Sequence, residues 1–388
     1  MIQEADRLQQ VQEYYFSRKL KEVRGLMAQG RPIINMGIGS PDLAPDPDVL
    51  QTLVNAITDS GAHQYQSYQG LPELRETIAD FYAKKFGVAL QPESEVLPLM
   101  GSKEGIMHIS MAFLNPGDRV LIPDPGYPTY ASVTNLVGAQ PIFYPLSEAN
   151  GWFPDLNALE HEGLDGVKLM WVSYPHMPTG AQASAAQLQE LIDFTRRHDI
   201  LLVNDNPYSF VLGNYPLSIL AGLGSMDHVL ELNSLSKTFN MAGWRVGMVL
   251  GAAPLINSVL KVKSNMDSGM FYGIQKGAIA ALKSGPDWFE SLDSIYQSRR
   301  KAVFELADLL GCTYDPNAVG MFVWARLPEG SDDAESYIDR LLYEKDLFVT
   351  PGTIFGKQGN GYIRFSLCVS EQRIREAVSR FIPVNARN

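Results

Sequence analysis

The feature that most constrains the fold is the alternation of short apolar runs with helical patterns through the middle of the chain. The runs are rich in Val, Ile and Leu and lack a clean two-residue alternation, which is typical of strands buried on both faces. Strands that alternate with helices favour an α/β fold with a mostly parallel sheet flanked by helices. Ligands of such sheets bind beyond the carboxyl ends of the strands. We expect six strands, at residues 118–123, 139–144, 167–174, 200–204, 228–233 and 244–250.

One helix between these strands has a clear start signal. Ser184 and Gln187 form a capping-box pattern, and apolar residues follow at helical spacing. Arg196 and Arg197 are cations suited to the carboxyl end of a helix. We therefore predict a helix that begins at Ser184 and ends near His198.

The C-terminal part of the chain has a different order of elements. We expect a long helix at 287–310, strands at 320–327, 347–350 and 361–367, and helices near 333–344 and 371–381. This mixture indicates a smaller α+β domain, which the first forty residues or so join. The expected division is a large domain at 46–284 and a small domain made of 1–45 and 285–388.

Size and charge exclude some classes of protein. The 388 residues, 45% of them hydrophobic, are enough for two or three domains. The net charge of −11 argues against non-specific binding of nucleic acid, which needs a basic face. The N-terminus does not resemble a secretory signal, and no apolar run approaches the length of a membrane span. We expect a cytoplasmic protein that binds neither nucleic acid nor membrane.

The cysteines and histidines favour structural over metal-binding roles. Cys312 and Cys368 fit no metal spacing and no disulfide framework, so we expect small buried hydrophobes in a reducing compartment. His108 and His176 are isolated among the six histidines, and no metal site is expected. No Ser/His/Asp set stands out either.

The segment with most chemistry is SLSKTFNMAGWR, from Ser234 to Arg245. Lys237 follows an apolar run and lies between two hydroxyls, and a lysine at the end of a buried strand is costly unless it is used. The hydroxyls and the arginine make an anion cradle. An amine beside a phosphate site is what a pyridoxal phosphate enzyme needs, since the amine forms a Schiff base and the cradle holds the phosphate. The alternative is a polar loop with a solvated lysine.

Two further segments offer groups that would suit the same cofactor. The turn at 100–105 precedes a helical pattern, so free backbone N–H groups, with Ser102 and Lys103, could bind phosphate. Asp205 follows an apolar strand, where a carboxylate can pair with a ring nitrogen, and Tyr208 could bond a ring hydroxyl. The alternatives are a plain helix cap for the first segment and a turn for the second.

Two more residues have a functional and an ordinary interpretation. Tyr127, in DPGYPTY, could stack on a planar cofactor, or belong to a proline-rich loop. Arg364 lies inside a β pattern and could read a carboxylate, or be a surface arginine of a strand.

Taken together, these segments resemble the class I and II aminotransferases, which are fold-type I pyridoxal phosphate enzymes. The resemblance covers essentially the whole chain. The segment SLSKTFNMAGWRVG around Lys237 is similar to the branch that contains LL-diaminopimelate and bacterial aspartate-type aminotransferases, and SNMDSGMF at 264–271 also resembles it. The resemblance implies that the large domain binds pyridoxal phosphate.

The resemblance also implies a role for each matching residue. Lys237 matches the catalytic Schiff-base lysine. The cofactor-binding matches are Ser102 and Lys103 in the phosphate turn, Ser234, Ser236 and Arg245 at the phosphate, Asp205 at the ring nitrogen, Tyr208 at the ring hydroxyl, Tyr127 stacked on the ring, and Tyr65 at the phosphate of a neighbouring subunit. Arg364 matches the arginine that holds the substrate's α-carboxylate, and Gly39 lies in the loop that closes over it. The match at Tyr65 implies a homodimer with shared active sites.

One position departs from the family pattern. The usual Asn-Pro-Thr-Gly reads Met177-Pro-Thr-Gly here, and a methionine cannot donate a hydrogen bond to the ring hydroxyl. Tyr208 would then be the only partner of the ring oxygen. Loss of a donor should raise the pKa of the bound cofactor, because that donor favours the deprotonated form.

The resemblance implies transfer of an amino group from an amino acid to a 2-oxo acid, without identifying either substrate. A pyridoxal phosphate-dependent β-lyase of the C–S lyase type is an alternative, because it shares the fold and these residues. A non-catalytic regulator on an aminotransferase-like domain is a second alternative. The acidic charge, the short segment before Gly37 and the retained Lys237 argue against the regulator.

Overall fold

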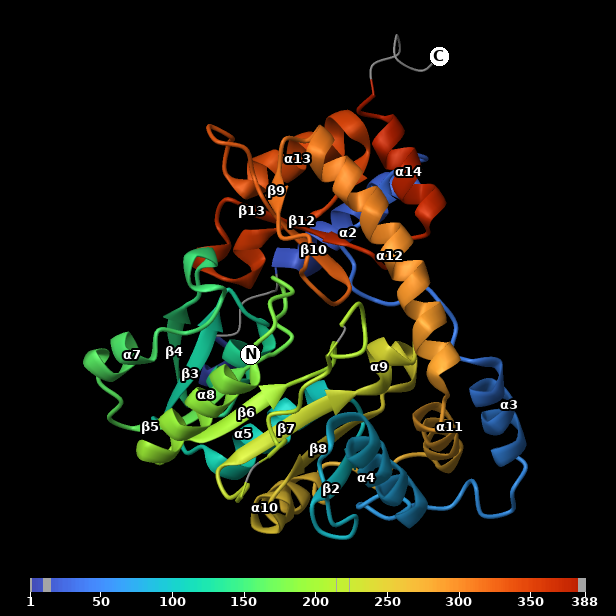
Figure 1. Ribbon diagram of the computed structural model, residues 1–388, viewed down its shortest axis with the longest axis vertical. Helices are drawn as coiled ribbons and strands as arrows, with labels where there is room; N and C mark the ends of the chain where they lie inside the picture. Colours follow the sequence, from blue (N-terminus) through green and yellow to red (C-terminus); the bar gives the residue numbers. More distant parts are fainter. Residues whose placement is uncertain (1, 10–14, 214, 223, 383–388) are drawn as a thin grey trace.

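The computed structural model describes residues 2–9, 15–213, 215–222 and 224–382, and its centre is a seven-stranded sheet (Figure 1). The strands are β2 (Val96–Leu99), β3 (Arg119–Asp124), β4 (Gln140–Pro145), β5 (Val167–Val172), β6 (Leu201–Asp205), β7 (Val229–Ser234) and β8 (Gly247–Gly251). Their order across the sheet is β2-β8-β7-β6-β5-β3-β4, and all of them are parallel except β8. The prediction of an α/β fold with a mostly parallel sheet is confirmed, and the six expected strands are present with small shifts at their ends.

Two features of this sheet were not expected. The short strand β2 was not predicted, and Pro98 explains why, since proline is confined to edge strands. β8 runs antiparallel to both its neighbours. Its first residues therefore come to the edge of the sheet where the parallel strands end.

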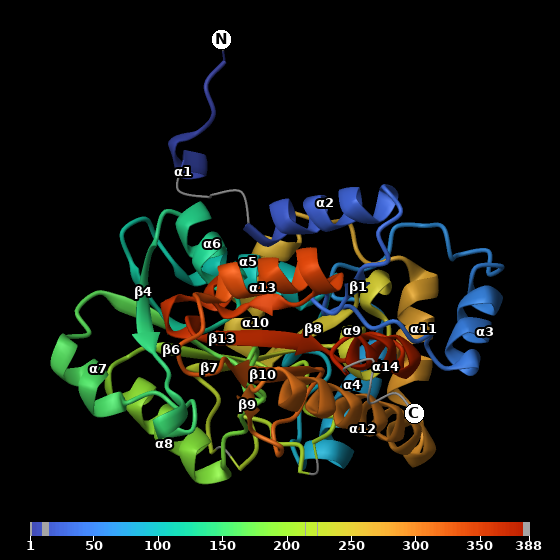
Figure 2. The ribbon, with the colours of Figure 1, turned by 90° about the horizontal axis from the view of Figure 1, so that it is seen from above.

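Helices cover both faces of the sheet, as the apolar strands require. Because neighbouring residues of a strand point to opposite faces, Leu169 and Trp171 of β5 join one apolar cluster and Met170 and Val172 join another. The first cluster includes α5 (Ser102–Phe113), α6 (Thr129–Leu136) and α10 (Ala253–Lys263); the second includes α4 (Pro72–Phe86), α8 (Ala185–Arg197) and α11 (Tyr272–Leu282). Helix α3 (Pro47–Ala56) lies beside α11 in both ribbon views, and α7 (Leu156–Glu162) precedes β5 (Figures 1 and 2).

The predicted capping box is confirmed. The backbone N–H of Gln187 donates to the Ser184 hydroxyl (3.2 Å), and the Gln187 side chain accepts from the Ser184 N–H (2.9 Å). Helix α8 ends at Arg197, so its two basic residues lie in the last turn.

A smaller sheet lies above the carboxyl ends of the large one in Figure 1. It has the order β12-β13-β10-β9, with all neighbours antiparallel. Its strands are β9 (Thr313–Tyr314), β10 (Phe322–Arg326), β12 (Thr350–Pro351) and β13 (Tyr362–Ser366), and the helices around it are α2 (Tyr15–Ala28), α12 (Pro286–Leu309), α13 (Ala334–Lys345) and α14 (Glu371–Ser379). The expected smaller α+β part is therefore present.

The N-terminal segment joins this smaller part. The strand β1 (Ile34–Asn35) pairs in parallel with β11 (Leu347–Phe348), while α1 (Asp6–Gln9) lies farther out in Figure 2. The division at 46–284 stays a prediction, although the pairing of β1 with β11 agrees with it. No helix among the described residues is long and apolar enough to cross a membrane.

The two parts are joined at the end of β3. The carboxylate of Asp124 accepts hydrogen bonds from the N–H groups of Lys357 (3.1 Å) and Gln358 (2.9 Å) in the smaller part. Gly356 precedes them at φ +136°, and a Cβ built on it would overlap Asp124 Oδ1. Only glycine allows this turn to approach the carboxylate so closely.

Candidate active site

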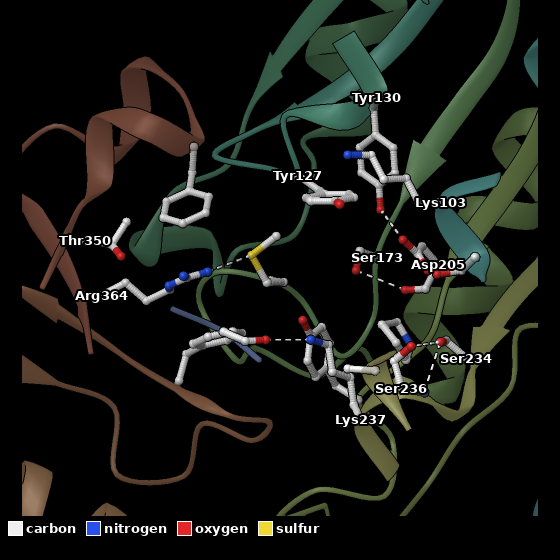
Figure 3. A pocket seen from close by; sticks show the side chains of 18 of the residues that line it. Lys103, Tyr127, Tyr130, Ser173, Asp205, Ser234, Ser236, Lys237, Thr350 and Arg364 are labelled. Carbon is white, nitrogen blue, oxygen red and sulfur yellow. Dashed lines mark hydrogen bonds between the residues drawn. The ribbon is translucent and has the colours of Figure 1, made fainter. Parts of the chain in front are cut away.

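A cavity of about 500 Å³ lies where the strands of the large sheet end, and the smaller part closes it from the other side. We call it the strand-end cavity. Figure 3 shows Arg364 and Thr350 on one side of it and Asp205, Ser234 and Lys237 on the other. Its lining is Gly39, Ser102, Lys103, Tyr127, Tyr130, Ser173, Met177, Asp205, Pro207, Tyr208, Ser234, Ser236, Lys237, Ala242, Arg245, Phe322, Thr350, Ile354, Phe355 and Arg364. Every site residue predicted from the sequence lines this cavity, except Tyr65.

The Lys237 turn follows β7 directly. Ser234 caps the short helix α9 (Leu235–Thr238), which turns the chain so that Lys237 faces the cavity. The Lys237 Nζ donates to the carbonyl oxygen of Gly39 at 2.6 Å. Burial lowers the pKa of Lys237, and the nearby cations Arg364 and Arg245 lower it further. The amine therefore loses its proton more easily than an exposed lysine does.

Donors for an anion gather beside this turn. Ser234 Oγ lies 2.8 Å from Ser236 Oγ, and Arg245 Nη1 lies 3.4 Å from the same Ser236 oxygen. Arg245 reaches this place because it lies two residues before the antiparallel strand β8, with φ +56°. The expected anion cradle is therefore assembled.

The N-terminus of α5 completes the cradle. This helix has twelve residues and begins at Ser102, after the turn at Gly101. Gly101 has φ +89°, and a Cβ on it would overlap the guanidinium of Arg245. The glycine thus lets the arginine lie against the positive end of the helix, where Ser102 and Lys103 also line the cavity.

Asp205 is a buried carboxylate with one hydrogen-bonded oxygen. Its Oδ2 accepts from the hydroxyl of Tyr130 (2.9 Å), while Oδ1 has no hydrogen-bond partner among the described residues. Burial raises the pKa of Asp205 to about 6, with a further increase from the charge of Glu231 and an opposite effect of the Tyr130 bond. A buried acceptor without a donor is costly, and a cationic N–H in the cavity would relieve that cost.

Two tyrosines form the walls next to Asp205. Tyr127 meets Tyr130 edge to face at 5.6 Å, and it lines the cavity after β3. Tyr208 is buried and meets Phe322 edge to face at 5.9 Å. Burial raises the pKa of both Tyr127 and Tyr208, so each stays a neutral phenol.

Arg364 is held among apolar and backbone groups. Its guanidinium carbon lies 3.9 Å from the centre of the Phe322 ring and 4.7 Å from that of Phe355. Its Nη1 contacts the Met177 sulfur at 3.5 Å, and its Nη2 donates to the Gly37 carbonyl at 3.0 Å. The ordinary interpretation of Arg364 as a surface residue is wrong, since the residue is only 6% exposed.

Gly39 belongs to the N-terminal wall of the cavity. A Cβ on it would lie 2.6 Å from Cζ of Phe322 and 3.8 Å from Nη2 of Arg364. Its carbonyl receives the Lys237 amine. The expected closing of this loop over a carboxylate stays a prediction.

Tyr65 lies apart from the strand-end cavity of its own chain. Its side chain is 90% exposed, in the loop that leads to α4. Its expected reach into a neighbouring subunit stays a prediction.

Several cavity residues had no predicted role. Tyr130, Ser173 and Phe322 are the clearest, and Ser173 Oγ donates to the Asp205 carbonyl (3.0 Å). Tyr130 is the last residue of the quoted DPGYPTY segment, and helical spacing after Tyr127 could have turned attention to it. Ser173 and Phe322 carry no sequence signal, because both lie within apolar strand patterns.

The expectation that His108 is isolated is wrong. The ring nitrogen of His108 lies 3.2 Å from Glu104, one helical turn before it on α5, and the two group with Asp267. Asp267 already has a cation, because Lys263 Nζ lies 2.7 Å from it. Cys312 and Cys368 are free and buried, as expected.

The chain is similar to known proteins along almost its whole length. The sequence pattern of the family described as aminotransferase class I and II matches residues 31–381. The chain is 40% identical over 380 residues to an LL-diaminopimelate aminotransferase of Nitratidesulfovibrio vulgaris, covering 97% of each chain. It is 39% identical over 376 residues to a protein of the same name from Dehalococcoides mccartyi, covering 96% of this chain and 97% of the other.

Solved structures with similar folds include substrate-bound BacF from Bacillus subtilis, with a TM-score of 0.94 and 34% identity. That match covers 98% of this chain and 97% of the other. A single mutant of the Thermus thermophilus aspartate aminotransferase has a TM-score of 0.91 and 26% identity, covering 98% and 99% of the two chains.

Proposed function

The chain belongs to the class I and II aminotransferases, and from this premise we propose what its cavity residues do and which amino acids it uses. A member of this family is a pyridoxal phosphate-dependent enzyme that moves an amino group from an amino acid to a 2-oxo acid. Nothing in the comparisons favours the β-lyase alternative.

The cavity has the right groups for this cofactor, and the observation that carries the proposal is the unpaired Asp205 Oδ1. A buried carboxylate oxygen with no donor suits the N–H of a protonated pyridine ring. We assign Asp205 as the group that holds this proton on the ring nitrogen, with Tyr130 fixing the orientation of the carboxylate. Bound pyridoxal phosphate supplies an electron sink for negative charge at the substrate Cα.

The phosphate is assigned to the cradle beside Lys237. Ser102 and Lys103 at the start of α5, with Ser234, Ser236 and Arg245, offer hydroxyls, charges and backbone N–H groups on one side of the cavity. These are the donors that bind phosphate at helix N-termini.

Lys237 is assigned as the catalytic residue. It would hold the cofactor through its amine, and once the substrate has displaced this link the free amine would carry a proton to and from the substrate Cα. The lowered pKa supports both tasks, since each needs a neutral amine for part of the cycle. Tyr127 and Tyr208 line the same cavity, where Tyr127 would cover the cofactor ring and Tyr208 would donate to the ring hydroxyl oxygen.

Arg364 is assigned to the substrate's α-carboxylate. Its guanidinium is fixed by two rings, a carbonyl and a thioether, so little side-chain entropy is lost when a carboxylate binds. This fixed position orients the Cα–H bond, and Gly39 forms the adjoining wall.

We propose LL-diaminopimelate as the first amino donor to test. Its support is the identity of about 40% with enzymes of that name over nearly the whole chain. A second candidate is an apolar amino acid, because Phe322, Ile354 and Phe355 line the cavity beside Arg364. The two differ in charge, so one experiment separates them.

The experiment follows the absorbance of the bound cofactor after single amino acids are added without any 2-oxo acid. LL-diaminopimelate should give the fastest change, and leucine or phenylalanine a slower one. Faster change with the apolar donors would reverse the choice. Release of ammonia and pyruvate from a cysteine conjugate would instead contradict transamination. A Lys237→Ala protein serves as the control and should give no turnover.

We also propose a homodimer in which Tyr65 reaches the partner's phosphate site. An exposed apolar surface supports it, formed by Tyr65 (90% exposed), Tyr68 (45%), Met266 (58%) and Phe271 (39%). Gly269, in the same segment as Met266 and Phe271, packs against the backbone of Gln66, so these residues belong to one surface. The cytoplasmic location stays a prediction.

A further inference from the structure

A second buried carboxylate lies in the strand next to Asp205. Glu231 is in the middle of β7, is 0% exposed and pairs with Asn204 of the neighbouring strand. Asp205 is the next residue after Asn204. Since successive side chains alternate between faces, Glu231 and Asn204 point toward α4 while Asp205 points toward Tyr130 and the cavity. The two carboxylates are therefore on opposite faces of one sheet.

Hydrogen-bond donors surround the Glu231 carboxylate, and the Ser218 side chain is one of them. It accepts from the Tyr82 hydroxyl (2.8 Å), the Ile219 N–H (2.9 Å) and the Asn204 side-chain amide (3.3 Å). Burial raises the pKa of Glu231 and hydrogen bonds lower it, with no cation among the described groups that act on it. A buried acid without a cation is expensive for stability alone, since an apolar residue would avoid the cost.

The donors to Glu231 also hold the backbone at two strand ends. The Tyr82 hydroxyl accepts from Asn233 Nδ2 (2.8 Å), and Asn233 Oδ1 accepts from the Ser234 N–H (2.7 Å). On the other side, Asn204 Oδ1 accepts from the Tyr174 N–H (2.9 Å). One chain of bonds thus ends at Ser234, which itself lines the cavity, and the other ends at Tyr174; each of these residues lies three positions before another cavity residue.

Those cavity residues are Lys237 after Ser234, and Met177 after Tyr174. The third strand end is that of β6, where Asn204 precedes Asp205 directly. One carboxylate therefore connects the ends of β5, β6 and β7. A fully bonded polar network of this kind is rigid, because no member can move without leaving a buried group unpaired.

We propose that Glu231 is a positioning residue for transamination. It fixes these three strand ends from the face of the sheet opposite Asp205, and its negative charge favours a protonated ring nitrogen beside Asp205. The inference rests on the proposed role of Asp205. A second negative charge in a low-dielectric interior opposes ionisation of Asp205 and stabilises a cation placed beside it. The charge of Glu231 does raise the pKa of Asp205, in agreement with this effect.

The test uses the variant Glu231→Gln with ¹⁵N-labelled pyridoxal phosphate bound and no substrate. Glutamine has nearly the same shape as glutamate but lacks the charge. Its side-chain NH2 group would also face a hydrogen-bond donor that now faces a carboxylate oxygen. The ring nitrogen signal should move toward the unprotonated position relative to the parent protein. With substrate, kcat should fall about tenfold or more while KM changes less than about twofold, because binding through Arg364 is preserved.

A second variant separates position from charge. Tyr82→Phe keeps the carboxylate but removes its link to Asn233, so kcat should fall several-fold while the ring nitrogen signal stays near that of the parent. It also keeps the proposal testable if Glu231→Gln does not fold. Glu190→Gln, an exposed position on α8, makes the same chemical change and should alter neither readout.

Two results would overturn the proposal: an unchanged ring nitrogen signal with folded Glu231→Gln, or kcat within twofold of the parent for Tyr82→Phe. The ring signal needs only bound cofactor, so it does not depend on which amino acid is the donor. A parent protein that fails to transaminate would instead contradict the proposed function.

Discussion

The sulfur of Met177 lies 3.5 Å from Nη1 of Arg364, so the residue that replaces the family's asparagine contacts the arginine assigned to the substrate carboxylate. In the usual arrangement this position donates a hydrogen bond to the ring oxygen. Here it is a weak acceptor toward a guanidinium. The substitution therefore changes the surroundings of the substrate site as well as those of the ring.

The variant Met177→Asn should restore a donor to the ring oxygen. The pH at which the absorbance of the bound cofactor changes should fall by about one unit, because a new donor stabilises the deprotonated form. A spectrophotometric titration measures this. Met177→Leu is the control, since it supplies no donor. An identical titration in the asparagine variant and the parent would show that the side chain at 177 does not reach the ring oxygen.

Asp205→Asn should have opposite effects on stability and catalysis. The folded-state pKa of Asp205 is raised from 3.8 to about 6, so the native apoprotein binds this proton more tightly than the unfolded chain. The contribution to stability therefore decreases as pH rises from about 4 to about 6, by about 3 kcal/mol for a shift of this size.

The asparagine variant lacks this titration. Its apoprotein should be more stable than the parent apoprotein above pH 6, when both are unfolded in urea, and the difference should shrink toward pH 4. Activity should fall by about a hundredfold or more, because no anion holds the proton on the ring nitrogen. A parallel pH dependence in both apoproteins would contradict the raised pKa.

Arg364→Lys should weaken binding of the α-carboxylate. Lysine keeps the charge but loses the bidentate geometry and the stacking on Phe322 and Phe355. We expect kcat/KM to fall about a hundredfold, mostly through KM. Steady-state kinetics over a range of donor concentrations measures it. Arg326→Lys, at an exposed arginine of β10, should stay near the parent.

Gly356→Ala should loosen the joint between the two parts of the chain. The new Cβ would overlap Asp124 Oδ1, and the φ of +136° is unfavourable for alanine. We expect a loss of about 2–3 kcal/mol in unfolding free energy. Gly330→Ala is the matched control, because Gly330 also has a positive φ (+76°) but open space around its Cβ. Equal losses in both variants would mean that the contact with Asp124 contributes nothing.

Complementation tests the shared active site. Lys237→Ala and Tyr65→Ala subunits should each have low activity alone. In a mixed dimer, one site combines the intact Lys237 of one chain with the intact Tyr65 of the other. Random pairing gives a native arrangement at about one site in four. No gain in activity on co-expression, with mixed dimers verified by mass, would refute the role of Tyr65.

Local features of this protein could be predicted from the sequence because their residues are close in the chain. The strand before Lys237, its turn and the cradle at Arg245 lie within one segment, and so does the capping box of α8. The direction of β8 could not be predicted, because an apolar run does not show which way its strand runs. The departure from the family pattern at Met177 is visible in the sequence, but the contact of Met177 with Arg364 depends on the fold.

Contacts between residues far apart in the sequence could not be predicted, because they depend on how the chain packs. Tyr130 and Asp205 are 75 residues apart, and their bond depends on the packing of α6 over the sheet. Glu231 lies in an apolar strand. A charged residue in such a strand indicates that it has a role, but the sequence does not show which residues donate hydrogen bonds to it. Tyr65 could be matched only by resemblance, since its side chain is 90% exposed and lies apart from the strand-end cavity of its own chain.

The cavity has a consequence for synthesis of the chain. Its walls come from both ends of the sequence: Lys237 bonds to Gly39, and Arg364 bonds to Gly37, which is 327 residues away. All strands of the large sheet are therefore synthesised before the part of the chain that carries Arg364. Until the strand that carries Arg364 emerges and pairs with β10, the apolar edge around Phe322 stays uncovered. During this interval a nascent chain needs protection from aggregation, and a truncated product would expose this edge permanently.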